Sequence, residues 1–160
     1  MFESIFRTLF KYERLVFEQG QFVLTATRSM WLVAGVAAAI ALAATDNRAV
    51  RRIYNVCEEP SFSELEWARK IAGEMRWKGE FIVLPVERTP SHLLKPGNVA
   101  QHWTASSARI RQELGYQEPV AIEEAIRRTI RWEQANPPAG MLLAQFDYAA
   151  EDAAIADHQR

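Results

Sequence analysis

Residues 52–85 decide the fold and read RIYNVCEEPSFSELEWARKIAGEMRWKGEFIVLP. Residues 53–56 favour a strand, because β-branched and aromatic side chains suit a pleated, half-buried surface. Ser63 and Glu66 have the spacing of a capping box, in which each residue satisfies a free backbone amide of the other. The capping box predicts a helix over residues 63–76.

The segments around this stretch extend the same alternation. Residues 80–87 (EFIVLPVE) form an apolar run that follows a Lys-Gly turn, and they predict a strand. Residues 22–28 (FVLTATR) alternate well enough to predict another. Between residues 22–28 and the strand expected at 53–56 lies an uncharged, alanine-rich stretch, MWLVAGVAAAIALAA, at residues 30–44. We expect it to form a buried helix, so the fold class is α/β with a small strand-helix-strand unit plus helices.

The alanine-rich stretch is also the place where a membrane segment could be suspected. It runs for about 15 residues without a charge, whereas a spanning helix usually needs about 20. A core helix is therefore the favoured interpretation, and a small membrane-associated protein anchored by residues 30–44 is an alternative. Residues 1–20 carry three glutamates and no continuous apolar run, so we expect no secretory signal there.

The two ends of the chain flank the expected domain. Phe2, Phe6 and Phe10 recur at helical spacing, which predicts an amphipathic helix within residues 1–20. Residues 21–138 form the main domain, with two further helices in SSARIRQELGY and AIEEAIRRTIRWEQ. In the first of them Ser106 is the expected N-cap and Gly115 the expected stop. Residues 139–160 are a tail that holds one more short helix or lies loose.

Composition excludes several classes of protein. The chain has 160 residues, with 19 Lys+Arg against 20 Asp+Glu and a formal net charge of -1. A nucleic-acid binder normally shows a basic excess, so we expect no nucleic-acid partner. The single cysteine, Cys57, excludes an intrachain disulfide framework and fits a reducing, cytoplasmic location.

Familiar catalytic and cofactor patterns are missing from the sequence. Cys57 and the three histidines show no paired metal-ligand spacing, so we expect no metal site. The seven glycines stand alone, so neither a dinucleotide-binding G-x-G-x-x-G nor a P-loop is present. Cys57 is expected to be a buried packing residue rather than a nucleophile.

One loop concentrates groups that suit a ligand. Residues 88–103 lack periodicity and contain Arg88, His92 and Trp103 among other cationic and polar side chains. Cationic and aromatic groups together suit an anionic or sugar-like ligand. The alternative is a loop that wraps the core and exposes its charges.

The order of these elements resembles the C-terminal part of the NAD-dependent epimerase/dehydratase family, the extended short-chain dehydrogenases/reductases. The resemblance covers roughly residues 31–138. Its marks are the alanine-rich helix, the YN-V strand at residues 54–56, the R-x-x-x-E-L-G-Y turn at residues 109–116, and the E-E-A-I-R-R-T-I-x-W helix that ends before Pro-Pro.

The resemblance implies a substrate-binding portion without its catalytic half. Family members bind NAD(P) on an N-terminal Rossmann domain and react through a Y-x-x-x-K pair, and many act on nucleotide sugars. No tyrosine of this chain has a lysine four residues later. We therefore expect no catalytic residue and no cofactor bound by this chain alone, and NAD(P) only in a full-length relative or a partner subunit.

Candidate substrate-binding residues follow from the same resemblance. Arg88 matches a position from which relatives reach a substrate phosphate, and Arg28, His92 and Trp103 are weaker candidates. Cys57 departs from the glycine that relatives carry after YN-V, which weakens the expectation of substrate binding.

The resemblance also implies that the structural elements on which parts of this chain normally pack are missing from it. In the resembled fold the YN-V strand pairs with the Rossmann sheet and the alanine-rich helix packs on that sheet. We therefore expect exposed apolar surface and a Rossmann-domain subunit or a second copy of the chain as partner. The alternatives are a protein-binding or assembly module and a truncated remnant.

Overall fold

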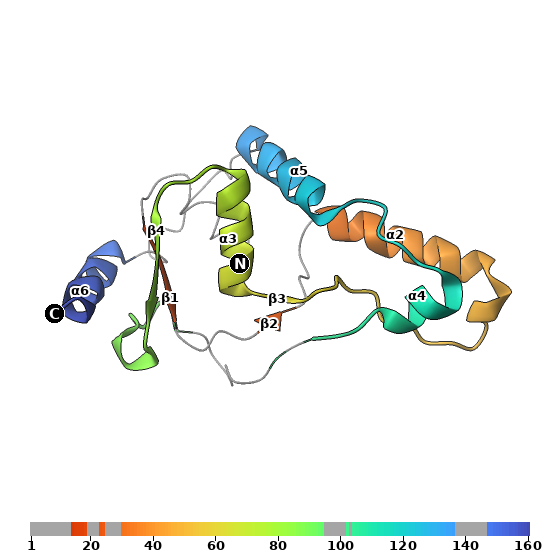
Figure 1. Ribbon diagram of the computed structural model, residues 1–160, viewed down its shortest axis with the longest axis horizontal. Helices are drawn as coiled ribbons and strands as arrows, with labels where there is room; N and C mark the ends of the chain where they lie inside the picture. Colours follow the sequence, from red (N-terminus) through yellow and green to blue (C-terminus); the bar gives the residue numbers. More distant parts are fainter. Residues whose placement is uncertain (1–13, 19–22, 25–29, 95–101, 103, 137–146) are drawn as a thin grey trace.

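A computed structural model describes residues 14–18, 23–24, 30–94, 102, 104–136 and 147–160. Within them, strand β1 (Arg14–Glu18) pairs in parallel with β4 (Glu80–Leu84), and β2 (Val23–Leu24) pairs antiparallel with β3 (Phe62–Ser63). Helices make up most of the described chain, and some of them extend away from these two short sheets (Figure 1). The described chain is thus helix-rich with few strands, which is compatible with the α/β class.

The amphipathic helix predicted within residues 1–20 is wrong at its C-terminal end. Residues 14–18 form β1, with Arg14 opposite Glu80 and Glu18 opposite Leu84. This stretch, RLVFE, contains apolar and aromatic residues that suit a strand as well as a helix face, and pairing with β4 decides between the two. Residues 1–13 lie outside the described residues.

The alanine-rich helix is present as α2 (Met30–Thr45), but the expectation that it is buried is wrong. Over the residues whose side chains are described, only Ala39 is buried, and Ile40 is 63% exposed. Its side chains are mostly small, so each one buries little apolar surface and contacts few other residues. Among the described residues, no helix is long and apolar enough to cross a membrane.

The main core lies between α3 (Glu64–Glu74) and α5 (Ile122–Ala135). The predicted capping box is confirmed, because the Ser63 side chain accepts from the Glu66 amide and Glu66 accepts from the Ser63 amide. The buried face of α3 then packs on that of α5. The buried members of this core are Trp67, Ala68, Ile71, Ala72, Ile126 and Ile130.

The strand predicted at residues 53–56 is wrong. These residues follow the short helix η1 (Asn47–Ala49) and have no regular secondary structure or strand partner in the described part of the chain. Ile53 is 84% exposed and Val50 is 65% exposed. The strand propensity is present, but a strand also needs a neighbouring edge to satisfy its backbone groups.

Helix α4 (Ala108–Leu114) begins at Ser107 rather than at the predicted Ser106. The Ser106 hydroxyl still accepts a hydrogen bond from the Ala108 amide. Gly115 ends the helix as predicted, with a φ of 73° that favours glycine. With α2, helix α4 forms a second small core of Ala39, Ile110, Leu114 and Tyr116.

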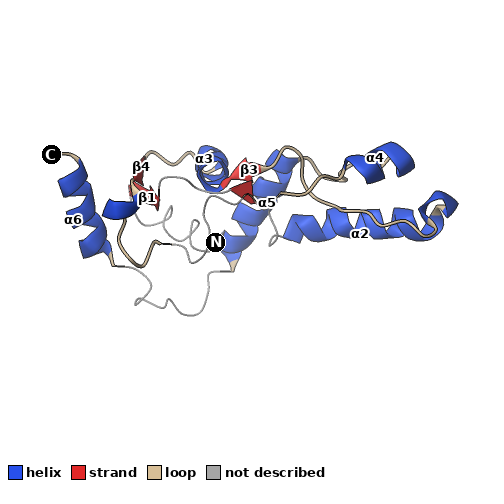
Figure 2. Cartoon of the chain, turned by 90° about the horizontal axis from the view of Figure 1, so that it is seen from below, coloured by secondary structure: helices blue, strands red, loops and turns tan. Residues whose placement is uncertain are grey.

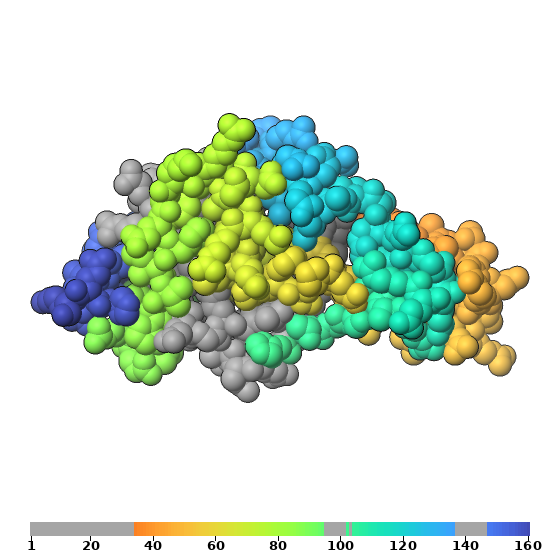
Figure 3. All heavy atoms as spheres, viewed as in Figure 1, coloured from red at the N-terminus to blue at the C-terminus, as the bar shows by residue number. Residues whose placement is uncertain are grey.

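The tail contains a helix, α6 (Tyr148–His158), which packs Ile155 against Ile82 and Leu84 of β4. It starts at Asp147, whose side chain accepts from the Ala150 amide. Two perpendicular views place α6 at one end of the molecule and α2 with α4 at the other (Figures 1 and 2). The space-filling view shows the same arrangement, with α6 in dark blue at one end and α2 in orange at the other (Figure 3).

Candidate functional site

The sequence-predicted site residues do not gather at one cavity. Arg88, at the end of the short helix η2 (Val86–Arg88), donates to the Asp157 carbonyl at 3.2 Å. His92 lies 2.9 Å from the Glu151 carboxylate. Both partners belong to α6, so these two side chains hold that helix against the β4 end of the molecule. Arg28 and Trp103 lie outside the described residues.

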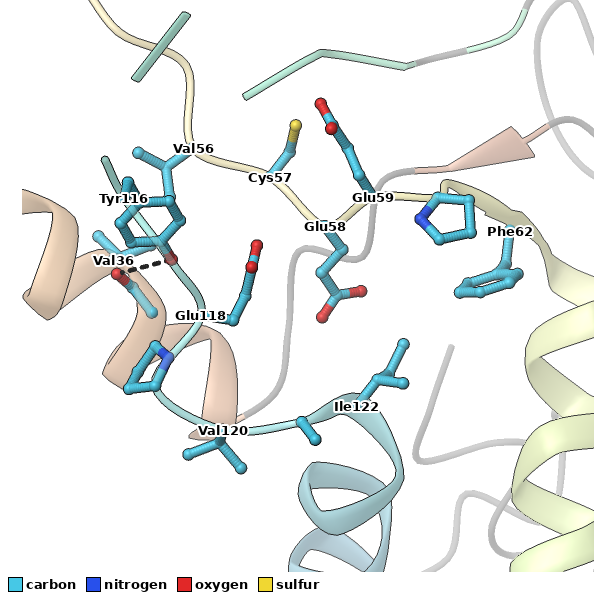
Figure 4. A pocket seen from close by; sticks show the side chains of 14 residues that line it. Val36, Val56, Cys57, Glu58, Glu59, Phe62, Tyr116, Glu118, Val120 and Ile122 are labelled. Carbon is cyan, nitrogen blue, oxygen red and sulfur yellow. Dashed lines mark hydrogen bonds between the residues drawn. The ribbon is translucent and has the colours of Figure 1, made fainter. Parts of the chain in front are cut away.

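A hollow of about 200 Å³ lies away from α6, between the first part of α2, the start of α5 and the loop that leads to β3. Its walls are residues 35–36, 56–60, 62, 116 and 118–122, and we call it the Glu58 hollow. Figure 4 shows the Glu58 side chain projecting from the loop toward Ile122, with Glu118 beside it. The loop and the start of α5 are thus opposite walls.

Helix α4 positions the loop wall through its side chains. Arg109 donates to the Ile53 carbonyl at 3.2 Å, and the Ser107 hydroxyl donates to the Cys57 carbonyl at 2.9 Å. The Tyr54 hydroxyl in turn donates to Glu113 at 2.7 Å, which lowers the pKa of that carboxyl. Hydrogen bonds from α4 therefore fix residues 53–57 without a β-ladder.

Two of the three carboxylates around the hollow have cationic or hydroxyl partners. Arg111 binds Glu118 with both of its terminal nitrogens. Glu59 accepts from the Ser106 hydroxyl at 2.8 Å and the Ser107 amide at 2.7 Å, and these bonds lower its pKa. Both side chains are held in place at the edge of the hollow.

Glu58 is the exception. The residue is only 8% exposed, and neither carboxyl oxygen has a hydrogen-bond partner among the residues that the structure describes. Burial, and secondarily the charge of Glu118, raises the pKa of Glu58 to about 8. At neutral pH Glu58 is therefore mostly a protonated acid, and a buried polar group without a partner is costly.

Tyr116 and Gly35 form the wall against α2. The Tyr116 hydroxyl donates to the Gly35 carbonyl at 3.2 Å, and a side-chain carbon at position 35 would lie 3.1 Å from that hydroxyl oxygen. Glycine thus permits the close approach. Burial raises the pKa of Tyr116, so it remains a hydroxyl at neutral pH.

Cys57 is a buried packing residue, as its place in the sequence predicted. It is 5% exposed, and its thiol donates to the Ala105 carbonyl. Burial raises the pKa of the thiol, which disfavours the nucleophilic thiolate. Among the described residues, no group of three or more His, Cys, Asp or Glu side chains could hold a metal ion.

Sequence reasoning did not select Glu58 or Glu118. The available signal was the acidic pair Glu58-Glu59 directly after the apolar YNVC, followed by Pro60. An acid next to an apolar segment is a candidate for burial, but only the fold shows which of the two glutamates points inward.

Comparisons with known proteins give a distant structural likeness. No protein-family model matches the chain, and no curated protein matches it. Among solved structures, the chain is similar to the crystal structure of the Bordetella bronchiseptica enzyme WbmF in complex with NADH, with a TM-score of 0.36 and 18% identity. The match covers 96% of this chain and 53% of that one, so the chain spans about half the length of WbmF.

Proposed function

We propose that the chain is the substrate-binding part of an enzyme that resembles the NAD-dependent epimerases/dehydratases, and that the Glu58 hollow holds a sugar-like substrate. One observation carries the proposal. Three of the sequence marks of that family meet at the hollow: Gly35 lies in the alanine-rich helix, Val56 ends YN-V, and Tyr116 ends the E-L-G-Y turn.

The chemistry of the hollow supports a small, hydroxyl-bearing ring. Apolar side chains such as Val36 and Ile122 offer a face for ring carbons, and the Glu58 and Glu118 carboxyls can accept hydrogen bonds from hydroxyls. The hollow is smaller than the roughly 300–1,000 Å³ of typical drug-sized ligand sites. A single ring suits it better than a whole nucleotide.

A phosphate does not suit this hollow, because the charges of Glu59 and Glu118 at its edge would repel it. If the substrate is a nucleotide sugar, its phosphates lie elsewhere. Arg88 is the predicted phosphate contact, but its side chain, 47% exposed, lies beside α6 and away from the hollow, so we assign it to a separate phosphate site. Arg28, His92 and Trp103 remain weaker predicted contacts.

In this proposal a partner subunit supplies the nicotinamide cofactor and the catalytic tyrosine and lysine. The exposed side chains of Ile40, Val50 and Ile53 support such a partner, because they leave apolar surface next to the unpaired residues 53–56. A sheet-bearing subunit of the Rossmann type would cover both features. Self-association of two copies is the competing outcome.

Calorimetric titration tests the substrate proposal. We expect the chain to bind a free hexose with millimolar affinity. Val36→Trp fills the hollow and abolishes hexose binding, whereas Val86→Trp, the same change at an exposed site, leaves it intact. Arg88→Ala should weaken binding of a nucleoside diphosphate at the separate phosphate site and leave hexose binding unchanged. No heat from any sugar with folded wild-type protein would contradict the proposal.

A further inference from the structure

We infer that the Glu58 hollow is a recognition site for an organic ammonium group, whose positive charge pairs with the Glu58 carboxylate while its apolar body lies against Val36, Val120 and Ile122. This inference deepens the proposed function, since it rests on the same hollow and adds that the bound ring carries an amine. It stands on the placement of one unpartnered carboxyl.

The first argument is geometric. Glu58 is more than nine-tenths buried, and neither of its oxygens has a partner within the described part of the chain. Its side chain points into the hollow rather than to solvent (Figure 4). A buried carboxyl in a folded protein normally has a hydrogen-bond or ion-pair partner. A ligand in the hollow is in position to supply it.

The second argument is electrostatic. The groups that face Glu58 or border its wall are Glu118, Glu59, Tyr116, Cys57 and Arg111. Tyr116 and Cys57 are neutral at neutral pH, and Arg111 is shared between the Glu118 and Glu59 carboxylates. The balance of these charged groups is negative, so a cation is attracted and an anion is repelled.

A neutral ligand gains less from this arrangement. A hydroxyl or carbonyl can accept one hydrogen bond from protonated Glu58, but it leaves the negative surroundings unbalanced. An ammonium group opposes both causes that keep Glu58 protonated, because it replaces lost hydration with a charged partner and offsets Glu118. When it binds, Glu58 releases its proton to solvent and the ammonium keeps all of its own.

The charge pairing has a measurable signature. Because Glu58 is mostly protonated at pH 7, binding of an ammonium ion should release roughly one proton per ligand. Its apparent affinity should rise about tenfold between pH 6 and pH 7 and level off above pH 8. A neutral ligand that accepts a hydrogen bond from Glu58 should instead bind more weakly above pH 8.

The probes are cyclohexylammonium and cyclohexanol, which share a ring and differ in charge, together with a free hexose. Calorimetry in two buffers of different ionisation enthalpy gives affinity and proton release for each. Glu58→Gln keeps the size and polar character of the side chain and removes its ability to ionise. Glu80→Gln makes the same change at an exposed position on β4, and circular dichroism checks that both variants fold.

We expect cyclohexylammonium to bind at least tenfold more tightly than cyclohexanol, with proton release that disappears in Glu58→Gln and persists in Glu80→Gln. Equal binding of the two ring probes, or undiminished ammonium binding to Glu58→Gln, would overturn the inference. Hexose binding without ammonium binding overturns the inference and leaves the proposed function standing. Ammonium binding without hexose binding supports the inference and removes the sugar proposal.

Discussion

Helices α5 and α2 both border the Glu58 hollow, but their outer faces differ. On α5 the exposed side is mostly charged, with Glu124 bound to Arg127 and Arg128, and with Arg127 also bound to Glu74 of α3. Trp132, which is 46% exposed, is the large apolar exception. Among the residues of α2 whose side chains are described, the exposed ones are alanines, Ile40 and the terminal Thr45. The surface of α5 is suited to water, whereas that of α2 resembles one side of an unfinished interface.

The difference extends to the cores beneath the two helices. The α3–α5 core contains several large side chains, including Trp67 and Ile71, whereas the α2–α4 core is small and joined to a loop held by side-chain hydrogen bonds. The α3–α5 region buries most of its apolar side chains within the chain. The α2–α4 region borders the Glu58 hollow and leaves apolar side chains exposed for a partner.

The largest effect on stability should come from a substitution in the α3–α5 core. Ile71 is completely buried in the α3–α5 core, and Ile71→Ala should lower the free energy of unfolding by about 2–5 kcal/mol through lost contacts and a cavity. Ile40→Ala makes the same change on the exposed side of α2 and should change stability by only about 0.5 kcal/mol. Urea denaturation measures the free energy of unfolding of both variants. Similar losses in the two variants would contradict the difference between the two regions.

The next effect comes from Glu58 and depends on pH. Its folded pKa of about 8 lies above the ordinary value of 4.5, so the folded state binds more protons across that interval and stability falls as pH rises. Between pH 5 and pH 8 the loss should be on the order of 3 kcal/mol. Urea denaturation at several pH values should show this slope in wild type and a flatter one in Glu58→Gln. An unchanged slope would place the pH dependence elsewhere.

A smaller effect is expected at the start of α3. Ser63→Ala removes half of the capping box and should cost about 1 kcal/mol. Ser61→Ala lies two residues earlier, caps no helix, and serves as the matched control. Thermal unfolding of both variants checks the assignment, which fails if the two are equally stable.

Local signals in the sequence were sufficient to predict elements whose hydrogen-bond partners lie within a few residues. The Ser63–Glu66 capping box and the glycine stop at Gly115 depend on nearest neighbours, and the structure confirms both. Segments that depend on distant partners were less predictable. Residues 14–18 became a strand because β4 lies alongside, and residues 53–56 did not become one because no described edge pairs with them.

The candidate site shows the same limit. Arg88 and His92 were selected for their chemistry, but α6 binds both, and that contact spans more than fifty residues of sequence. Glu58 was not selected, because its burial depends on α2 and on the segment before α5. Tertiary packing decides which of the adjacent glutamates, Glu58 or Glu59, becomes buried, and the local sequence does not show this.

Dye binding tests most directly the claim that the α2 end is an open interface. The measurement is titration of the folded chain with a fluorescent hydrophobic dye, for wild type and for the triple variant Ile40→Ser, Val50→Ser, Ile53→Ser, with sedimentation to give the mass. We predict saturable dye binding by wild type that falls severalfold in the variant while urea stability stays nearly unchanged. A monomeric wild type that unfolds in one sharp transition and binds no dye would contradict the account.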